Sequence, residues 1–253
     1  MRLIAIIPAR MDAQRLPGKP LADIGGRPMV VRVAEAASRA RGVDKVIVAT
    51  DHHRIAAAVE DCGFAAVLTS ERCRNGTERV AEAARTLDGD AYLNVQGDEP
   101  LIDPGSISSL AMLLREGVAY GTLARRLQPG EESQPSVVKV VLDAQGRALY
   151  FSRSLIPFPR APGLVAPLAH LGIYGFSRDF LRTFAALPET GLEQAEGLEQ
   201  LRALFHGHAL HVRVGDWTST AVDTPEDLEQ VRALWKARHG SDPAPSGPER
   251  RTA

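Results

Sequence analysis

Over residues 1–100, short apolar runs alternate with segments whose apolar positions recur every three or four residues. The second pattern is typical of helices with one buried face. Alternation of strands and helices at these lengths indicates parallel strands joined by right-handed crossovers. We therefore expect a doubly wound sheet, in which ligands bind beyond the carboxyl ends of the strands. The predicted strands are 2–8, 45–50, 65–69 and 91–95, and the predicted helices are 28–40, with Pro28 in the first turn, 54–62 and 78–87.

After residue 100 the pattern changes, because β-like runs follow one another with only short polar links such as 143–146. Thr224 is a suitable N-cap for the last predicted helix. The final residues, 239–253, are rich in Pro, Gly and Ser, and we expect them to be disordered. The predicted helices are 108–117, 179–187, 197–207 and 225–239, and the predicted strands are 121–127, 137–143, 147–152, 170–177 and 208–214.

The composition fits a folded protein and argues against nucleic acid and membranes as partners. Hydrophobic residues make up 44% of the 253 residues, which is enough for a sizeable core. Lys and Arg number 30 against 31 Asp and Glu, so the overall charge does not draw the chain to nucleic acid or to an anionic membrane. Any anion must be bound by locally placed cations.

The cysteine count and the hydropathy indicate a reducing, cytoplasmic location. Only Cys62 and Cys73 occur, which is too few for a disulfide framework or a zinc site. The apolar run that ends at Pro8 is too short for the apolar region of a signal peptide. No apolar stretch approaches the length of a membrane span. We expect a cytoplasmic protein.

Three cations follow the first predicted strand within one short segment. Arg10, Arg15 and Lys19 stand among small residues, with Pro17 and Gly18 before the lysine. The forked guanidinium of Arg and the compact ammonium of Lys suit the binding of a triphosphate, and so does a backbone that can approach the ligand closely. The segment has neither the P-loop pattern nor the G-x-G-x-x-G pattern of dinucleotide sites. The alternative interpretation is a solvated basic loop.

Two acidic positions could complete such a site. The fourth predicted strand runs into Gln96 and Asp98, and a carboxylate beside a triphosphate mainly serves to hold Mg²⁺. The alternative for Asp98 is an exposed acidic turn. Asp223 lies between an apolar pair and the start of the last helix, where acids are also favoured simply by the helix dipole.

Together these stretches resemble a known family over residues 1–238, the 3-deoxy-manno-octulosonate cytidylyltransferases, also called CMP-Kdo synthetases. RLPGKPL is shared with other sugar nucleotidyltransferases, whereas the later motifs are narrower. The motifs that carry the resemblance are IPAR and RLPGKPL within 6–21, VATDH (48–52), NGTERVAE (75–82), NVQGDEPLI (94–102), VVKVV (137–141), ALYFSR and IP within 148–157, HLGIY (170–174), LEQLRAL (198–204) and VDTPEDLE (222–229).

The resemblance implies a reaction and an organisation. CTP and Kdo would give CMP-Kdo and pyrophosphate with Mg²⁺, for lipopolysaccharide synthesis, in a cytosolic homodimer. The implied fold is that of the nucleotide-diphospho-sugar transferases, which is similar to glycosyltransferase A. One domain, 1–238, would contain a nucleotide-binding core of about 1–120 with a return at 205–238, and a mixed β/α sugar-binding and dimerisation part at about 121–204.

The resemblance also implies roles for residues at matching positions. Taken from the residues alone, Arg79 could merely begin a helix, His170 could be structural, and Glu199 could be a solvated helix acid. The implied catalytic residues are Lys19, Arg10, Asp98 and Asp223, the last two as metal ligands; the implied nucleotide-binding residues are Ala9, Arg10, Arg15, Lys19, Arg79 and Asp98; and the implied sugar-binding residues are Gln96, Arg160, His170, Tyr174, Glu199 and Gln200.

The chain departs from the family pattern beside the implied site. Arg72, Cys73 and Asn75 stand where an Asp-His pair and a Ser are usual, Ser136 replaces a common Asn, and Phe158 replaces Trp or Tyr. A related acid, such as 8-amino-Kdo or a nonulosonic acid, therefore stays open as the substrate. A nucleotide-binding module without turnover is the alternative from another class.

Overall fold

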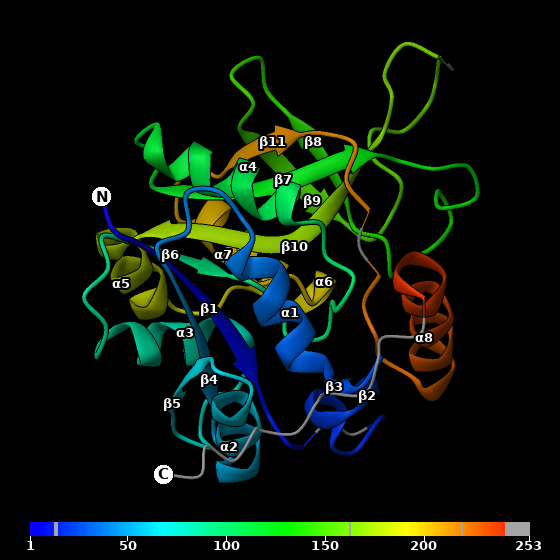
Figure 1. Ribbon diagram of the computed structural model, residues 1–253. Helices are drawn as coiled ribbons and strands as arrows, with labels where there is room; N and C mark the ends of the chain where they lie inside the picture. Colours follow the sequence, from blue (N-terminus) through cyan, green and yellow to red (C-terminus); the bar gives the residue numbers. More distant parts are fainter. Residues whose placement is uncertain (13–14, 162, 219, 241–253) are drawn as a thin grey trace, which may run out of the picture.

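The computed structural model describes residues 1–12, 15–161, 163–218 and 220–240, and shows helices packed on both faces of one mixed sheet (Figure 1). The predicted α/β class is confirmed. Most of the segment predicted to be disordered, 241–253, lies outside the described residues. The strands are β1 (Leu3–Ala9), β2 (Asp23–Ile24), β3 (Arg27–Pro28), β4 (Lys45–Thr50), β5 (Ala65–Leu68), β6 (Ala91–Asn94), β7 (Tyr120–Arg126), β8 (Lys139–Leu142), β9 (Ala148–Ser152), β10 (Leu168–Ser177) and β11 (His211–Val214).

The helices lie close to their predicted positions, apart from the differences described below. None of them, over the described residues, has both the length and the apolar character that crossing a membrane requires. The helices are α1 (Met29–Ser38), α2 (His53–Asp61), α3 (Gly76–Ala84), α4 (Pro104–Arg115), α5 (Arg178–Ala186), α6 (Gly191–Glu196), α7 (Gln200–Phe205) and α8 (Pro225–His239), with a short 3-10 turn, η1, at Lys19–Leu21.

The described strands of the main sheet number nine, and seven of them follow the order β11-β7-β10-β6-β1-β4-β5. Strands β6, β1, β4 and β5 are parallel, as predicted for the first hundred residues. Strand β10 runs antiparallel between β6 and β7, and β8 and β9 extend the sheet from β10. Because β11 joins β7 in parallel, the chain returns to the same sheet after residue 205.

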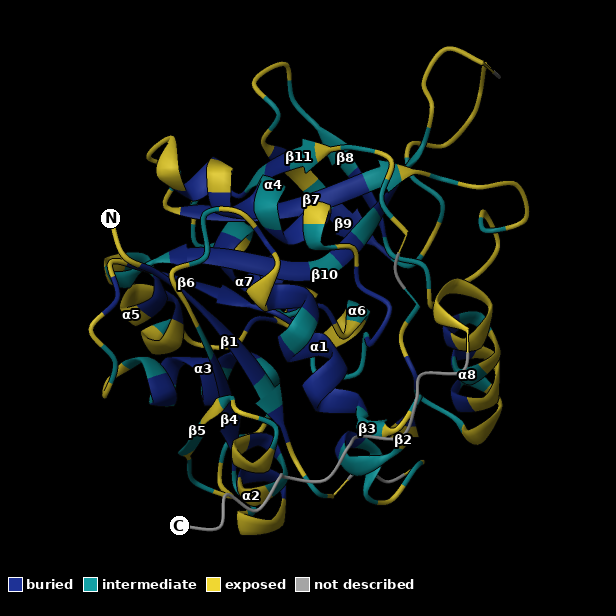
Figure 2. Ribbon diagram, viewed as in Figure 1, coloured by how far each residue is buried: buried dark blue, intermediate teal, exposed yellow. Residues whose placement is uncertain are grey.

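Strand β1 is buried on both faces, which explains its continuous apolar sequence. Leu3, Ala5 and Ile7 pack in a cluster with residues of α1, α2 and α4. Ile4 and Ile6 point the other way, into a cluster with residues of α3, α5 and α7. The dark ribbon at the centre of Figure 2 shows this buried middle layer. The two helical layers leave the carboxyl end of β1 free to form a site.

Local structure differs from the prediction in three places. Pro28 ends β3 and caps α1 instead of lying in its first turn. The predicted helix 197–207 is the shorter α7, and the short helix α6 before it was not expected; Gly197 separates the two, because its left-handed φ of 62° ends α6. The hairpin β2–β3 was not expected, since a strand pair of two residues each is too short to show alternation.

Helix α8 is confirmed with its cap, and it lies against the hairpin β2–β3 (Figure 1). Thr224 and Asp227 form a reciprocal capping box at its start. Near its end, the Trp235 ring packs 4.1 Å from the Arg32 guanidinium. Arg32 also donates to the carbonyl of Ile24 at 2.8 Å in the hairpin. These contacts fix the helix that follows Asp223.

We expect Gly25→Ala to lower the free energy of unfolding by about 2 kcal/mol or more. Gly25 has a φ of 58°, and a Cβ there would lie 2.6 Å from Trp235 Cδ1, so both the backbone and the α8 contact would be strained. Urea unfolding measures the loss. Gly63→Ala is the matched control, because Gly63 has a φ of 84° but no neighbour within 4 Å of an added Cβ. Equal losses for the two variants would contradict the contact.

Candidate active site

The predicted nucleotide and metal residues line one cavity of about 520 Å³ at the carboxyl ends of β1 and β6. This is the position expected for a ligand in a parallel sheet. A second cavity, of about 440 Å³, contains none of the predicted site residues and is lined by parts of α3 and α5. The first cavity is lined by Pro8, Ala9, Arg10, Arg15, Leu16, Lys19, Pro20, Cys73, Arg74, Asn75, Gly76, Arg79, Gln96, Gly97, Asp98 and Asp223.

Lys19 joins the two predicted metal ligands, although they lie far apart in the sequence. Its Nζ donates to Asp98 Oδ2 at 2.7 Å and to Asp223 Oδ1 at 3.2 Å. It also donates to the carbonyl of Val222 at 2.8 Å, and Arg15 contacts Asp223 at 3.1 Å. The Lys19 side chain is only 15% exposed, so these charge interactions are stronger than on an open surface.

The amino terminus of α3 faces the same cavity. Asn75 caps the helix by accepting from the backbone N–H of Glu78, and Asn75 and Gly76 both line the cavity. The positive end of the helix dipole therefore adds to the cations Arg10 and Arg15. This arrangement favours an anionic ligand with several charges.

Gly97 allows β1 and the segment after β6 to approach closely. A Cβ on this residue would lie 2.7 Å from the carbonyl oxygen of Pro8. Only glycine fits there without a backbone shift. The close approach sets Asp98 opposite the cationic segment.

Arg79 is buried at the cavity wall and is held by ion pairing. Its guanidinium donates to Asp51 Oδ2 at 2.6 Å and to Thr69 Oγ1 at 2.6 Å. Asp51 follows β4 directly, so the ends of two neighbouring strands, β4 and β5, fix the orientation of the arginine. A guanidinium fixed in this way can present a planar donor edge to a ligand.

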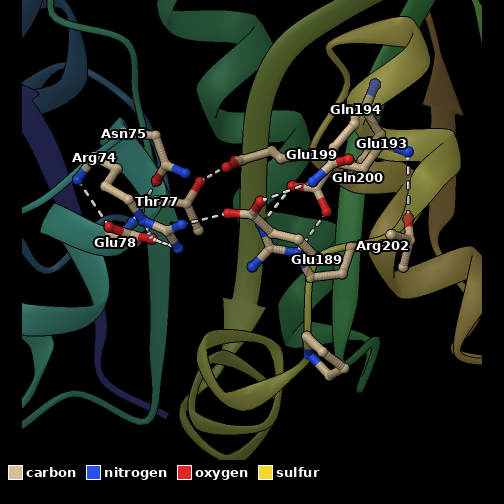
Figure 3. A network of polar contacts seen from close by, with 12 residues as sticks. Arg74, Asn75, Thr77, Glu78, Glu189, Glu193, Gln194, Glu199, Gln200 and Arg202 are labelled. Carbon is tan, nitrogen blue, oxygen red and sulfur yellow. Dashed lines mark hydrogen bonds and ion pairs between the residues drawn. The ribbon is translucent and has the colours of Figure 1, made fainter.

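Of the predicted sugar-binding residues, Gln96 lines the cavity and Glu199 connects to it through Thr77. Figure 3 shows Thr77 and Glu199 pointing toward one another, where the Thr77 hydroxyl donates to Glu199 Oε1. Asn94 Nδ2 donates to Thr77 Oγ1 at 3.0 Å, and Gln96 Nε2 donates to Asn94 Oδ1 at 3.2 Å. Glu199 is therefore joined to the cavity through side chains.

Three other predicted sugar-binding residues form a neighbouring cluster. The Tyr174 hydroxyl donates to Gln200 Oε1 at 3.1 Å, and the His170 ring lies 5.4 Å from the Tyr174 ring. Among the described residues, Gln200 Nε2 is a buried donor without a partner. Arg160 lies apart, on the exposed segment between β9 and β10, and the described residues show no hydrogen bond or ion pair that joins it to this cluster.

Burial shifts the pKa of two of these groups toward the neutral form. Packing against Phe151 and Tyr174 lowers the pKa of His170 to about 3, so the imidazole is neutral at pH 7 and its Nε2 pairs with Thr122 Oγ1 at 2.9 Å. Burial also raises the pKa of Glu199, while the Thr77 hydroxyl and the nearby Arg202 oppose the shift. His170 can therefore offer hydrogen bonds but no charge.

Several residues at this site were not predicted from the sequence. Asp51 ends the VATD run after a predicted strand, and the same rule that selected Asp98 could have found it. Asn94 and Thr77 carried no such signal, because an Asn inside a strand and a Thr inside a helix start are ordinary. Their role depends on burial: they are 1% and 3% exposed.

We expect Cys73 to be unreactive at neutral pH although it lines the cavity. Burial, and then the hydrogen bond to Glu82, raise the pKa of its thiol to about 11, so the reactive thiolate is scarce at pH 8. The rate of alkylation should rise only as the pH approaches this pKa. Glu82→Gln removes the nearby negative charge and should make Cys73 react faster. Mass spectrometry resolves Cys73 from Cys62, and rapid alkylation of Cys73 at pH 7 would contradict the assignment.

A family model described as Cytidylyltransferase matches residues 4–210. The chain belongs to the cytidylyltransferase family. Its members are nucleotidyltransferases, and a cavity that combines cations with paired carboxylates agrees with that class.

Two relatives match almost the whole chain, and both are named 3-deoxy-manno-octulosonate cytidylyltransferase. The protein of Anaeromyxobacter sp. (strain Fw109-5) is 54% identical, over 93% of this chain and 98% of its own length. The protein of Myxococcus xanthus (strain DK1622) is 50% identical, over 94% of this chain and 98% of its own length. The implied family is therefore confirmed.

Two solved structures also match. CMP:2-keto-3-deoxy-manno-octonic acid synthetase complexed with CTP superposes with a TM-score of 0.91 and is 41% identical, over 94% of this chain and all of its own. A cytidylyltransferase from Leptospira borgpetersenii superposes with a TM-score of 0.63 at 16% identity, over 92% of this chain and 86% of its own, and shows only the shared fold.

Proposed function

We propose that this cytidylyltransferase transfers CMP from CTP to the anomeric hydroxyl of Kdo, releasing pyrophosphate. The observation that carries the proposal is the meeting of Lys19, Asp98 and Asp223 at 2.7 and 3.2 Å in the cavity. The relatives that bear the Kdo-specific name cover nearly all of this chain. The product supplies activated Kdo for lipopolysaccharide synthesis.

The residues present fit a bound Mg²⁺. Asp98 and Asp223 already converge on one cationic group, the Lys19 ammonium, and Mg²⁺ in nucleotide sites takes one or two carboxylates together with phosphate oxygens. When bound, the metal neutralises charge on the α-phosphate and lowers the pKa of the attacking hydroxyl. Asp98 and Asp223 would hold it.

The chain's own residues position the nucleotide. Arg10, Arg15 and Lys19 bind the triphosphate with the amino terminus of α3, and the backbone at Ala9 borders it. Arg79, held by Asp51, contacts the cytosine ring. Phosphoryl transfers of this kind depend on positioning and charge neutralisation, and need no covalent intermediate with the enzyme.

The sugar lies over the side that Gln96, Tyr174, Glu199 and Gln200 form. An unpaired buried N–H costs about 1–3 kcal/mol, and a sugar oxygen would offset that cost at Gln200 Nε2. Neutral His170 contributes a hydrogen bond, and Arg160 supplies charge for the sugar carboxylate.

The working enzyme is a cytoplasmic homodimer in this proposal. The segment between β9 and β10 exposes large apolar side chains, Phe158 at 83% and Leu164 at 80%, which a second copy would cover. We assign this sugar and dimer part to about 121–204 of a single domain, 1–238. The two free cysteines agree with a reducing compartment.

Pyrophosphate release from CTP, measured with a panel of sugar acids, tests the proposal. We expect turnover with Kdo, loss of turnover after chelation of Mg²⁺, and much weaker turnover with sialic-type acids. Preference for 8-amino-Kdo or a nonulosonic acid would keep the reaction class but change the sugar acid that is the substrate. Tight CTP binding without release of pyrophosphate for any acid would instead indicate a nucleotide-binding module.

A further inference from the structure

We propose that Thr77 is a positioning residue for the sugar half of the site: its hydroxyl orients Glu199 directly and Gln96 through Asn94. The inference rests on the proposed function, because it takes Gln96 and Glu199 as sugar contacts. It adds two residues, Thr77 and Asn94, that carry no charge and do not themselves face the cavity.

The hydrogen bonds of this network have a single consistent direction. The one proton of the Thr77 hydroxyl goes to Glu199 Oε1, and this hydrogen bond favours the carboxylate form of Glu199 by opposing the effect of burial on its pKa. The Thr77 oxygen is then free to accept from Asn94 Nδ2, at 3.0 Å. With its NH₂ group committed to Thr77, Asn94 presents its Oδ1 to Gln96, whose Nε2 donates at 3.2 Å. The network therefore fixes the orientation of the side-chain amides of Asn94 and Gln96.

Burial keeps the network in this state. Thr77 is 3% exposed and Asn94 1%, so water does not compete for their polar atoms. Asn94 is also held in the sheet, where it pairs with Tyr174 on β10 and with Ile6 on β1. An amide flip would leave buried donors and acceptors mismatched, which is costly in a low-dielectric interior.

The consequence for the ligand is a pair of acceptors. Gln96 Nε2 donates to Asn94, so Gln96 Oε1 points the other way, toward Gly76, which also lines the cavity. A Cβ added to Gly76 would lie 3.6 Å from this oxygen. The other acceptor is the Glu199 carboxylate, oriented by the same hydroxyl. Two acceptors suit the hydroxyl donors of a polyhydroxylated acid and repel its carboxylate, which must lie nearer the cations.

Thr77→Val removes the hydroxyl and keeps the branched shape. We expect the KM for Kdo to rise about tenfold, with kcat and the KM for CTP changed by less than about twofold. Thr77→Ser restores the hydroxyl and should return the KM for Kdo to within about twofold of the unchanged protein. Thr86→Val is the matched control, since Thr86 lies just after the other end of α3, exposed and outside the network.

The split between substrates separates this inference from the proposed function. If the unchanged protein does not turn over Kdo, the proposed function fails first. If it does, an unaltered KM for Kdo in Thr77→Val overturns the positioning role. Equal rises in both KM values, or no rescue by serine, would show that Thr77 only supports α3. Should Thr77→Val fail to fold, Thr77→Ala removes the same hydroxyl without changing these expectations.

Discussion

Replacing Asp98 with asparagine should lower kcat by about a thousandfold or more. The carboxylate lies 2.7 Å from Lys19 Nζ and is one of the two carboxylates among the described residues that line the cavity. Asparagine keeps the shape but binds Mg²⁺ far less well. The side chain is 30% exposed, so the melting temperature should change by only a few degrees.

The measurements for this variant are pyrophosphate release under saturating substrates and thermal unfolding followed by circular dichroism. Asp179→Asn is the matched control, because Asp179 is an exposed carboxylate on α5, away from the cavity. Near-normal turnover in Asp98→Asn would refute its assignment as a metal ligand. A large loss of stability would mean that the residue supports the fold instead.

Replacing Lys19 with methionine should lower kcat/KM for CTP by about 100-fold to 1000-fold, while the KM for Kdo changes by less than about threefold. The ammonium reaches both carboxylates and the Val222 carbonyl, so its loss leaves Asp98 and Asp223 to repel each other and removes a charge that binds phosphate. Methionine keeps most of the aliphatic side chain, which packs beside the partly buried site.

Steady-state kinetics with each substrate varied in turn measures the effect of the lysine. Lys45→Met is the control, because Lys45 begins β4 with an exposed side chain and does not line the cavity. An equal loss for CTP and Kdo would contradict a triphosphate role for Lys19. It would favour a general role in holding η1 against the segment before α8.

The strands, most helices and the cationic segment could be predicted from the sequence because each depends on local signals. Leu3 to Ile7 is apolar throughout, and the carboxyl end of such a strand is where a ligand binds. Asp223 could be selected only through the family resemblance. Its proximity to Lys19 depends on the return of the chain through β11 and on the docking of α8 against the β2–β3 hairpin.

What could not be predicted depends on burial and on contacts between distant segments. Thr77 and Asn94 have unremarkable sequence surroundings, and only the packing of α3 against β6 brings them together. Helix α6 was not predicted because its six residues are too few to show a helical period, and the left-handed φ of Gly197 that ends it leaves no periodic signal. Arg79 lies in a motif that the sequence shows, but its partner Asp51 follows β4, and the motif does not reveal this contact.

The most direct test is a crystal structure with CTP and Mn²⁺, in which anomalous scattering locates the metal. We expect one manganese ion bound by Asp98 and Asp223 and by the α-phosphate, with Lys19 and Arg15 on the triphosphate. A metal bound away from these two carboxylates, or CTP outside the cavity, would contradict it.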